Sequence, residues 1–355
     1  MGLLLMACAT PPAAAPAPPS DEETTPAATV VVEGTDPTPD SAADRFDPDR
    51  EPDSIAFDDL EDSLGPVPEP TQDYAVGVVV KFLGNPYWTV LTEGMSTQAA
   101  EYGITLDVQS AESEADQLGQ LVLMEEMIDQ GYDAILVSPQ TDTNLLPAVE
   151  RAEEAGILVL NVNDAVLPDA QHWVGPNQYE NGVRAANYLI RTFPEGGKVA
   201  VIEGQTGVYA AGQRTQGFGD TLEGTPFEVV ASIPADWDAD LAADVATSIM
   251  EDYPDLVAFY CNNDIMALGV VEALKETGDL DKVLVIGTDG IEPAYDSIRA
   301  GELNGTIDSF PFTTGQAAIN VLIRLLEGQP VPRAVYSPQN MIIQENVDNP
   351  QQPIP

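Results

Sequence analysis

The chain has 355 residues, enough for two domains of ordinary size, and its 44% of hydrophobic residues is normal for a globular protein. It carries 59 Asp and Glu residues against 13 Lys and Arg, a formal net charge of −46. Such a field repels polyanions, which excludes nucleic acids and anionic lipid headgroups as main partners. His172 is the only histidine, so neither a His-dependent catalytic triad nor a His-rich metal site can be assembled.

The first eight residues read as a truncated lipoprotein signal. Leu5-Met6-Ala7-Cys8 has the order of a bacterial lipobox, in which the cysteine thiol receives the lipid and the preceding segment is removed. Only seven residues precede Cys8 and none is basic, so we expect the true start to lie upstream. A chance Ala-Cys pair in an apolar N-terminus is the alternative interpretation.

Residues 9–72 are rich in Pro, Ala, Thr, Asp and Glu. Low hydrophobicity and high like charge predict a disordered, extended tether that holds a folded part away from a membrane. Two apolar islands, Val30-Val31-Val32 and Ile55-Ala56-Phe57, interrupt the tether, and we interpret them as incidental linker residues.

From Tyr74 onward strands and helices alternate. The continuous apolar run 75–80 predicts a strand that is covered on both faces, and apolar spacing predicts a helix over 87–102. The elements expected next are strand 104–108, helix 117–130, strand 134–137, helix 144–155 and strand 157–162. A second round comes after them: helix 181–193, strand 199–203, helix 213–222, strand 228–232, helix 241–250, strand 257–261, helix 265–277 and strand 283–287.

Strict alternation predicts parallel sheets with right-handed crossovers, and two such rounds predict an α/β chain of two Rossmann-like lobes. A leftover helix, 314–327, and a strand, 340–345, can return to complete the lobes, so we expect a hinge of several strands. The expected division is 73–176 with 310–337 for the N-lobe, and 177–309 with 338–348 for the C-lobe.

Side chains suited to binding hydroxyl groups lie just after the predicted strands. In open parallel sheets, ligands bind beyond the carboxyl ends of the strands, where loops and helix N-termini converge. The segments there supply amides, carboxylates, one Lys and one Arg, and two indoles that can lie against a sugar ring. They include Lys81, Asn85, Trp88, Ser138, Asn163-Asp164, Arg214, Asp236-Trp237-Asp238, Asn262-Asn263-Asp264 and Asp289. Any one Asp or Asn at these positions is more often a turn former or a helix N-cap. The prediction of a ligand site therefore rests on the number of such side chains gathered at one edge of both predicted sheets.

Enzyme signatures are missing from the sequence. No Gly-x-x-x-x-Gly-Lys-Ser/Thr loop is present, and no Gly-x-Gly-x-x-Gly comes after the first strand. Cys261 ends an apolar strand and is interpreted as a small buried hydrophobe, and His172 as a loop or hinge residue. We therefore expect no catalytic residues, no cofactor and no metal.

Several motifs, in order, resemble those of periplasmic sugar-binding proteins of the ribose/galactose type, the soluble partners of bacterial ABC importers. They are Asn85-Pro86-Tyr87-Trp88, Pro176-Asn177-Gln178-Tyr179-Glu180-Asn181-Gly182, Arg214-Thr215-Gln216-Gly217-Phe218, Pro234-Ala235-Asp236-Trp237-Asp238, Asn263-Asp264-Ile265-Met266-Ala267-Leu268-Gly269 and Gly287-Thr288-Asp289-Gly290. Within the family, the chain is most similar to the allose-binding members.

The resemblance implies a role for each matching position. Lys81, Asn85, Tyr87 and Trp88 would contact the sugar from the N-lobe, and Ser138, Asn163 and Asp164 lie after neighbouring strands. Arg214 would bind ring or anomeric oxygens, Trp237 would stack opposite Trp88, and Asn263 and Asp289 would bind the remaining hydroxyls. Asn163 and Ser309 depart from the family's usual Asp and Gln, which leaves the identity of the sugar open.

The resemblance also implies an extracytoplasmic, lipid-anchored monomer that closes two lobes around a monosaccharide and delivers it to an ABC permease. A sensor that presents the sugar to a chemoreceptor or histidine kinase is an alternative, and a Rossmann-type sugar oxidoreductase is a remote one. A LacI-type repressor would carry a basic helix-turn-helix where this chain has an acidic tether.

Overall fold

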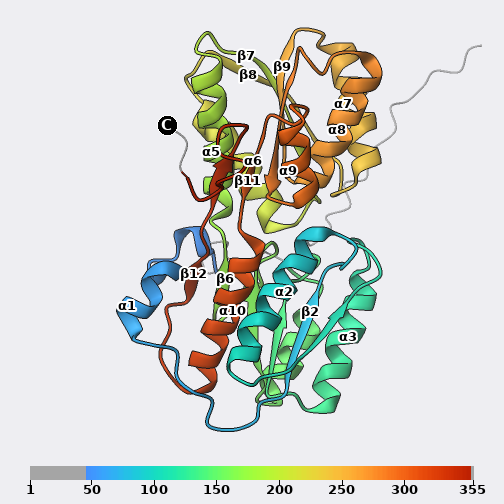
Figure 1. Ribbon diagram of the computed structural model, residues 1–355. Coiled ribbons are helices and arrows are strands. Elements are labelled where there is room, and N and C mark those ends of the chain that lie inside the picture. The colour runs from blue at the N-terminus through green and yellow to red at the C-terminus, as the bar shows by residue number, and fades with distance from the viewer. Residues whose placement is uncertain (1–44, 353–355) are drawn as a thin grey trace, which may run out of the picture. The chain divides into compact units, whose positions relative to one another are not determined.

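Two β-sheets organise the residues that the computed structural model describes, 45–352 (Figure 1). The first sheet is parallel throughout, and we call the part built on it the N-lobe. Its seven strands run in the order β1 (Ser54–Ala56), β12 (Ala334–Tyr336), β6 (Trp173–Gly175), β5 (Leu158–Val162), β4 (Ala134–Val137), β2 (Val76–Val80) and β3 (Leu106–Ser110). Its helices are α1 (Leu60–Leu64), α2 (Pro86–Glu101), α3 (Gln117–Gln130), α4 (Leu146–Glu154) and α10 (Pro311–Leu326), with short 3-10 turns at Pro48–Arg50 and Phe57–Asp59.

The second sheet forms what we call the C-lobe, and only its edge strand β13 runs antiparallel. Its six strands run in the order β13 (Asn340–Ile342), β11 (Gly305–Asp308), β10 (Leu284–Asp289), β9 (Leu256–Cys261), β7 (Gly197–Glu203) and β8 (Phe227–Pro234). Its helices are α5 (Gln178–Thr192), α6 (Tyr209–Leu222), α7 (Ala239–Asp252), α8 (Asp264–Thr277) and α9 (Glu292–Arg299). The predicted fold class, two Rossmann-like lobes, is confirmed.

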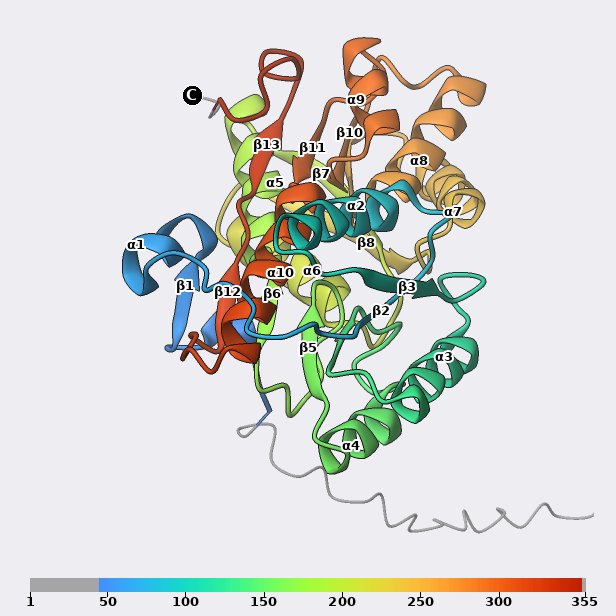
Figure 2. The same ribbon diagram turned by 60° about the horizontal axis from the view of Figure 1, so that its bottom comes forward.

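Helices cover both faces of the N-lobe sheet, which explains the continuous apolar run of β2. Val78 and Val80 pack in the core that contains Leu91 and Met95 of α2. Val79, which points the other way, packs with residues of α3 and α4. Figure 2 shows α2 beside α10 over the first of these faces. No described helix is long and apolar enough to cross a membrane.

The chain passes between the two sheets three times. It leaves the N-lobe after Gly175 to enter α5, returns after Asp308 to enter α10, and leaves again between Tyr336 and Asn340. Three short connections, 176–177, 309–310 and 337–339, therefore join the lobes, and a rotation of one lobe against the other has to occur at these residues.

The prediction of a disordered tether as far as residue 72 is wrong for residues 45–72. Strand β1 extends the N-lobe sheet, with Ile55 opposite Val335 of β12, and Leu60 is buried in the core. Ile55 and Phe57, interpreted from the sequence as incidental, pack against that core. The composition of the segment is unfavourable for independent folding, but a sheet edge supplies the hydrogen bonds and apolar contacts it lacks. The predicted signal and the first part of the tether, 1–44, lie outside the described residues.

Residues 45–56, which we call the N-terminal clasp, contact both lobes. On the N-lobe side, the Phe46 amide donates to the Pro168 carbonyl at 2.9 Å, and the Arg333 guanidinium lies 4.2 Å from the Phe46 ring centroid. On the C-lobe side, Asp49 accepts a hydrogen bond of 2.9 Å from the Tyr179 amide at the start of α5. The Tyr209 hydroxyl, at the start of α6, donates to Asp47 and accepts from the Asp49 amide. The clasp thus adds cross-lobe contacts to the three connections.

Helices α5 and α6 contact each other backbone to backbone, and this contact positions Arg214. A Cβ atom at Gly182 would lie 2.1 Å from the Arg214 carbonyl oxygen, and one at Gly217 would lie 2.1 Å from the Tyr179 carbonyl oxygen. Only glycine permits this approach. It brings Arg214 of α6 within 2.8 Å of Gln178 of α5, to which its Nε donates.

Replacing Gly182 by alanine should lower the free energy of unfolding by about 1–3 kcal/mol, because the added methyl group forces the two helices apart. The matched control is Gly219→Ala in the same α6, where no described residue, apart from the chain neighbours and the backbone of the same helix, comes within 4 Å of the new methyl group. That variant should be about 0.5–1 kcal/mol more stable than the parent, since alanine favours helix. Urea unfolding of both variants measures this, and equal stabilities would contradict the packing argument.

Candidate ligand site

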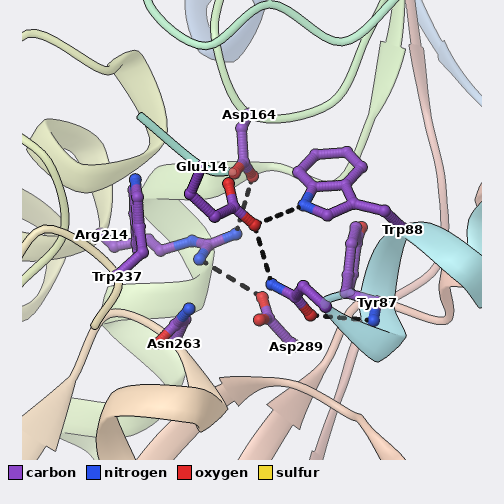
Figure 3. A pocket seen from close by; sticks show the side chains of 9 residues that line it. Tyr87, Trp88, Glu114, Asp164, Arg214, Trp237, Asn263 and Asp289 are labelled. Atoms are coloured by element: carbon purple, nitrogen blue, oxygen red, sulfur yellow. Dashed lines mark hydrogen bonds and ion pairs between the residues drawn. The ribbon is translucent and has the colours of Figure 1, made fainter. Parts of the chain in front are cut away.

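One small cavity lies between the carboxyl ends of the strands of the two sheets. Its volume is about 10 Å³, room for about one water molecule. Residues of both lobes line it: Asn85, Tyr87, Trp88, Glu114, Asp164, Arg214, Trp237, Asn263 and Asp289 (Figure 3). All of these except Glu114 were predicted from the sequence, and the structure brings them together.

The first turn of α2 supplies the N-lobe wall. Asn85 is the N-cap residue, and its Oδ1 accepts from the backbone amide of Tyr87 at 3.0 Å. The side-chain nitrogen of Asn85, Nδ2, then faces Glu114, which also lines the cavity. Tyr87 and Trp88 pack edge to face, with ring centroids 5.1 Å apart. Burial raises the pKa of Tyr87 well above its usual value, and its hydroxyl makes no hydrogen bond with the described residues.

Three loops after strands supply the C-lobe wall. Trp237 lies after β8 with a left-handed backbone conformation, φ 66°, and its ring lies over Gly204, where any Cβ would be within about 2 Å of it. Asn263 caps α8 by accepting from the Met266 amide at 2.9 Å. Asp289 ends β10. In Figure 3, Trp88 and Trp237 lie on opposite sides of the polar cluster.

Arg214 links carboxylates of the two lobes. Its guanidinium lies 3.4 Å from Asp164 of the N-lobe and 3.5 Å from Asp289 of the C-lobe, and also donates to the Asn262 carbonyl at 2.5 Å. The side chain is only 1% exposed, so these contacts replace its hydration. Burial alone would raise the pKa of Asp164, but the charges of Lys81 and Arg214 outweigh it and lower that pKa.

Four predicted residues lie behind the cavity wall. Lys81, at the end of β2, forms an ion pair of 2.9 Å with Asp164, and its ammonium lies 5.5 and 5.4 Å from the ring centroids of Trp88 and Trp237. Asn163 donates to Asp164 at 3.1 Å and accepts from Gln178 at 3.4 Å. The hydroxyls of Ser138 and Ser309 are buried and have no partner among the described residues.

These positions revise the interpretation of the departure at Asn163. From the sequence, the amide there is interpreted as a lost carboxylate. In the structure a carboxylate does line the cavity, but it belongs to the next residue, Asp164, and Asn163 helps to orient it.

Glu114 is the cavity residue that was not predicted from the sequence. It lies in the loop between β3 and α3, beyond the carboxyl end of β3. The other residues were located because they lie just after strands, and the same criterion applies to this loop. Glu114 Oε1 accepts from Asn85 Nδ2 at 3.1 Å and from Trp88 Nε1 at 2.9 Å.

The remaining sequence interpretations concern residues away from the cavity. Cys261 is fully buried at the end of β9, and burial raises the pKa of its thiol, as expected of an inert core residue. His172 lies in the loop before β6, with Nδ1 3.4 Å from the Pro332 carbonyl. Among residues 45–352 no cluster of His, Cys, Asp and Glu suited to a metal ion occurs.

A group of buried carboxyls stands behind the C-lobe wall. Asp308 of β11 pairs in register with Asp289 of β10, and Asp264 accepts from the Gly290 and Ile291 amides. Burial raises the pKa of Asp289 and of Asp264, and it raises the pKa of Asp308 to about 7 although Tyr295 and the Phe310 amide donate to it. Ionising this group therefore costs folding free energy.

Asp308→Asn should flatten the pH dependence of stability. In the unfolded chain this carboxyl ionises near its ordinary pKa of 3.8, and in the folded chain near 7. Between these values the folded state retains a proton that the unfolded state has lost, so stability falls as the pH rises from about 4 to about 7. In the variant, the decrease in unfolding free energy between pH 4.5 and pH 7.5 should be smaller by on the order of 3 kcal/mol. Urea unfolding at the two pH values measures this difference. The exposed control Asp281→Asn should keep the parental slope.

Comparison with known proteins agrees with this architecture. The D-allose-binding periplasmic protein of Escherichia coli strain K12 is 33% identical over 261 residues, which cover 71% of this chain and 83% of that protein. A ribose import binding protein of Bacillus subtilis strain 168 is 28% identical over 275 residues, which cover 77% of this chain and 88% of that protein. A crystal structure of an ABC transporter periplasmic solute-binding protein from Actinobacillus succinogenes 130z with bound D-allose has a TM-score of 0.74 at 30% identity. The structural match covers 78% of this chain and 100% of the chain in that crystal structure.

Residues 76–330 match the family described as the periplasmic binding protein domain. The match includes most strands of both sheets and every residue that lines the cavity. The chain therefore belongs to the periplasmic binding protein domain family.

Proposed function

We propose that this protein captures a monosaccharide of the allose or ribose type between its two lobes, outside the cytoplasm, and delivers it to an ABC importer. The observation that carries the proposal is the cavity between two indoles, with Arg214, Asp164, Asp289, Asn85 and Asn263 as its polar groups. Indole faces suit the C–H face of a sugar ring, and the polar groups suit its hydroxyls. The relatives described above bind D-allose and ribose according to their names, which agrees with this ligand class.

Capture requires the lobes to move. A cavity of about 10 Å³ is far smaller than a sugar ring, so a monosaccharide has to enter while the lobes are apart. We propose that residues 73–176 with 310–337 move as one body and 177–309 with 338–348 as the other. The contacts that such a motion breaks include the 3.0 Å hydrogen bond from the Ala210 amide to the Asp164 carbonyl and that from the Tyr209 amide to Asp142. A sugar that contacts both walls favours the closed arrangement.

The protein is proposed to act as a monomer without catalytic activity, anchored by lipid at Cys8. The anchor rests on the lipobox order Leu5-Met6-Ala7-Cys8, which lies outside the described residues, and mass spectrometry of the exported protein tests it. A sensor role remains an alternative, because the same closed form can be recognised by a receptor instead of a permease.

Calorimetric titration with D-allose, D-ribose, D-arabinose, D-fucose and myo-inositol tests the proposed ligand class. At least one aldose should bind and raise the melting temperature, since a ligand that binds only the folded state stabilises it. Trp237→Ala should weaken that binding by at least about 30-fold because it removes one aromatic wall of the cavity. Leu118→Ala, which changes a side chain on α3 that is 71% exposed, is the control and should bind normally. Absence of binding by every sugar would remove the proposal.

Tyr209→Phe should weaken sugar binding by roughly threefold to tenfold although Tyr209 does not line the cavity. The variant loses the hydroxyl that joins α6 of the C-lobe to Asp47 and Asp49 of the clasp, so the closed arrangement becomes less favourable. Small-angle X-ray scattering without sugar should then give a larger radius of gyration. Tyr188→Phe on α5 is the control; an unchanged affinity and radius for Tyr209→Phe would mean that the clasp does not influence closure.

A further inference from the structure

Glu114 is held in place by the loop that carries it. Asp116 caps α3 through the Gly119 amide at 2.9 Å and accepts from the Glu112 amide at 3.3 Å. Gln140, which lies after β4, donates to the Ser113 carbonyl at 2.9 Å. The backbone on both sides of Glu114 is therefore fixed to neighbouring elements, which gives its side chain a defined position at the cavity (Figure 3).

One oxygen of Glu114 organises the N-lobe wall. Oε1 accepts from both Asn85 Nδ2 and Trp88 Nε1, the amide and the indole that project from the first turn of α2. Since the other side-chain atom of Asn85 is committed to capping α2, these bonds fix the orientation of the amide group. The second oxygen, Oε2, makes no hydrogen bond within residues 45–352.

Glu114 differs electrostatically from the other carboxylates that line the cavity. Asp164 pairs with Lys81 and Arg214, and Asp289 pairs with Arg214. In the part of the chain that the structure describes, Glu114 forms no ion pair. Burial raises its pKa, while the more distant charge of Lys81 and the two donors act in the opposite direction. A partly buried carboxylate with an unused oxygen is a strong acceptor for a hydroxyl hydrogen.

Glu114 also lies where the cavity meets a larger outer pocket. That pocket has a volume of about 420 Å³ and lies between the loops after β2 and β3 of the N-lobe and the start of α7 in the C-lobe. Asn85, Glu114 and Trp237 line both spaces. A ligand that enters from the outer pocket meets Glu114 before it reaches Arg214.

We propose that Glu114 is a ligand-contacting and specificity-determining residue: Oε1 fixes Asn85 and Trp88, and Oε2 accepts the hydrogen of one sugar hydroxyl. This inference rests on the proposed function and names a contact within it. Because a carboxylate only accepts, the site selects a hydroxyl at that ring position and rejects sugars in which it is absent, oxidised or methylated.

Glu114→Gln distinguishes the roles of the two carboxylate oxygens. Glutamine can keep an acceptor oxygen toward Asn85 and Trp88, but it replaces the second acceptor by an amide donor. Binding of D-allose, or of D-ribose if that is the sugar bound, should weaken at least about tenfold. The monodeoxy analogue that lacks the contacted hydroxyl should bind the parent and the variant with equal affinity. Glu112→Gln, an exposed change in the same loop, is the control and should leave every affinity unchanged.

A loss that is confined to sugars with one particular hydroxyl supports the contact. A parental profile for Glu114→Gln, or an equal loss for every analogue, would show that Glu114 only positions Asn85 and Trp88, and the proposal would be wrong. Binding of neither sugar by the parent protein would instead remove the proposed function, which distinguishes the two failures.

Discussion

The buried guanidinium of Arg214 is the interaction on which the site depends. It belongs to the C-lobe, yet it pairs with Asp164 of the N-lobe as well as with Asp289 of its own lobe. A buried cation needs nearby carboxylates to offset its lost hydration, and carboxylates this deeply buried need the cation in return. The arrangement with the lobes together is therefore the one in which Arg214 contacts a carboxyl group of each lobe. When the lobes separate, water has to solvate the side of the Arg214 guanidinium that Asp164 contacts in this arrangement.

Both the fold and the clasp serve this arrangement. The contact of Gly182 and Gly217 with the facing backbones sets the distance between α5 and α6, and therefore the position of the Arg214 guanidinium. The clasp is fixed to the edge of the N-lobe sheet by β1 and binds the first turns of the same two helices through Asp47 and Asp49. It lies outside the residues matched by the family, 76–330. Its position makes it sensitive to any rotation of α5 and α6.

Much of the fold and most of the cavity could be predicted from the sequence because both depend on strong periodic signals. Long strands buried on two faces, such as β2 and β9, produce unmistakable apolar runs, and parallel sheets bring the segments after them together. Strands β1, β6 and β11, of three or four residues each, have no such apolar run and were not predicted. The folding of residues 45–72 was missed because composition describes a segment alone, and β1 is stabilised by β12, 280 positions away. Glu114 was missed although it lies after β3, because one carboxylate among 59 Asp and Glu residues does not stand out by residue type.

The charge of the whole chain and that of the site lead to one conclusion about the ligand. Only 13 residues are Lys or Arg, and Lys81 and Arg214 are both buried around one cavity. Asp164 and Asp289 already lie in ion-pair contact with them, and Glu114 adds a further carboxyl group that has no ion-pair partner among the described residues. A phosphorylated sugar would meet repulsion both from the field of the protein and from the site itself. Neutral hydroxyls can donate to the carboxylates and accept from the guanidinium without adding charge, so the arrangement favours an uncharged sugar over its phosphate ester.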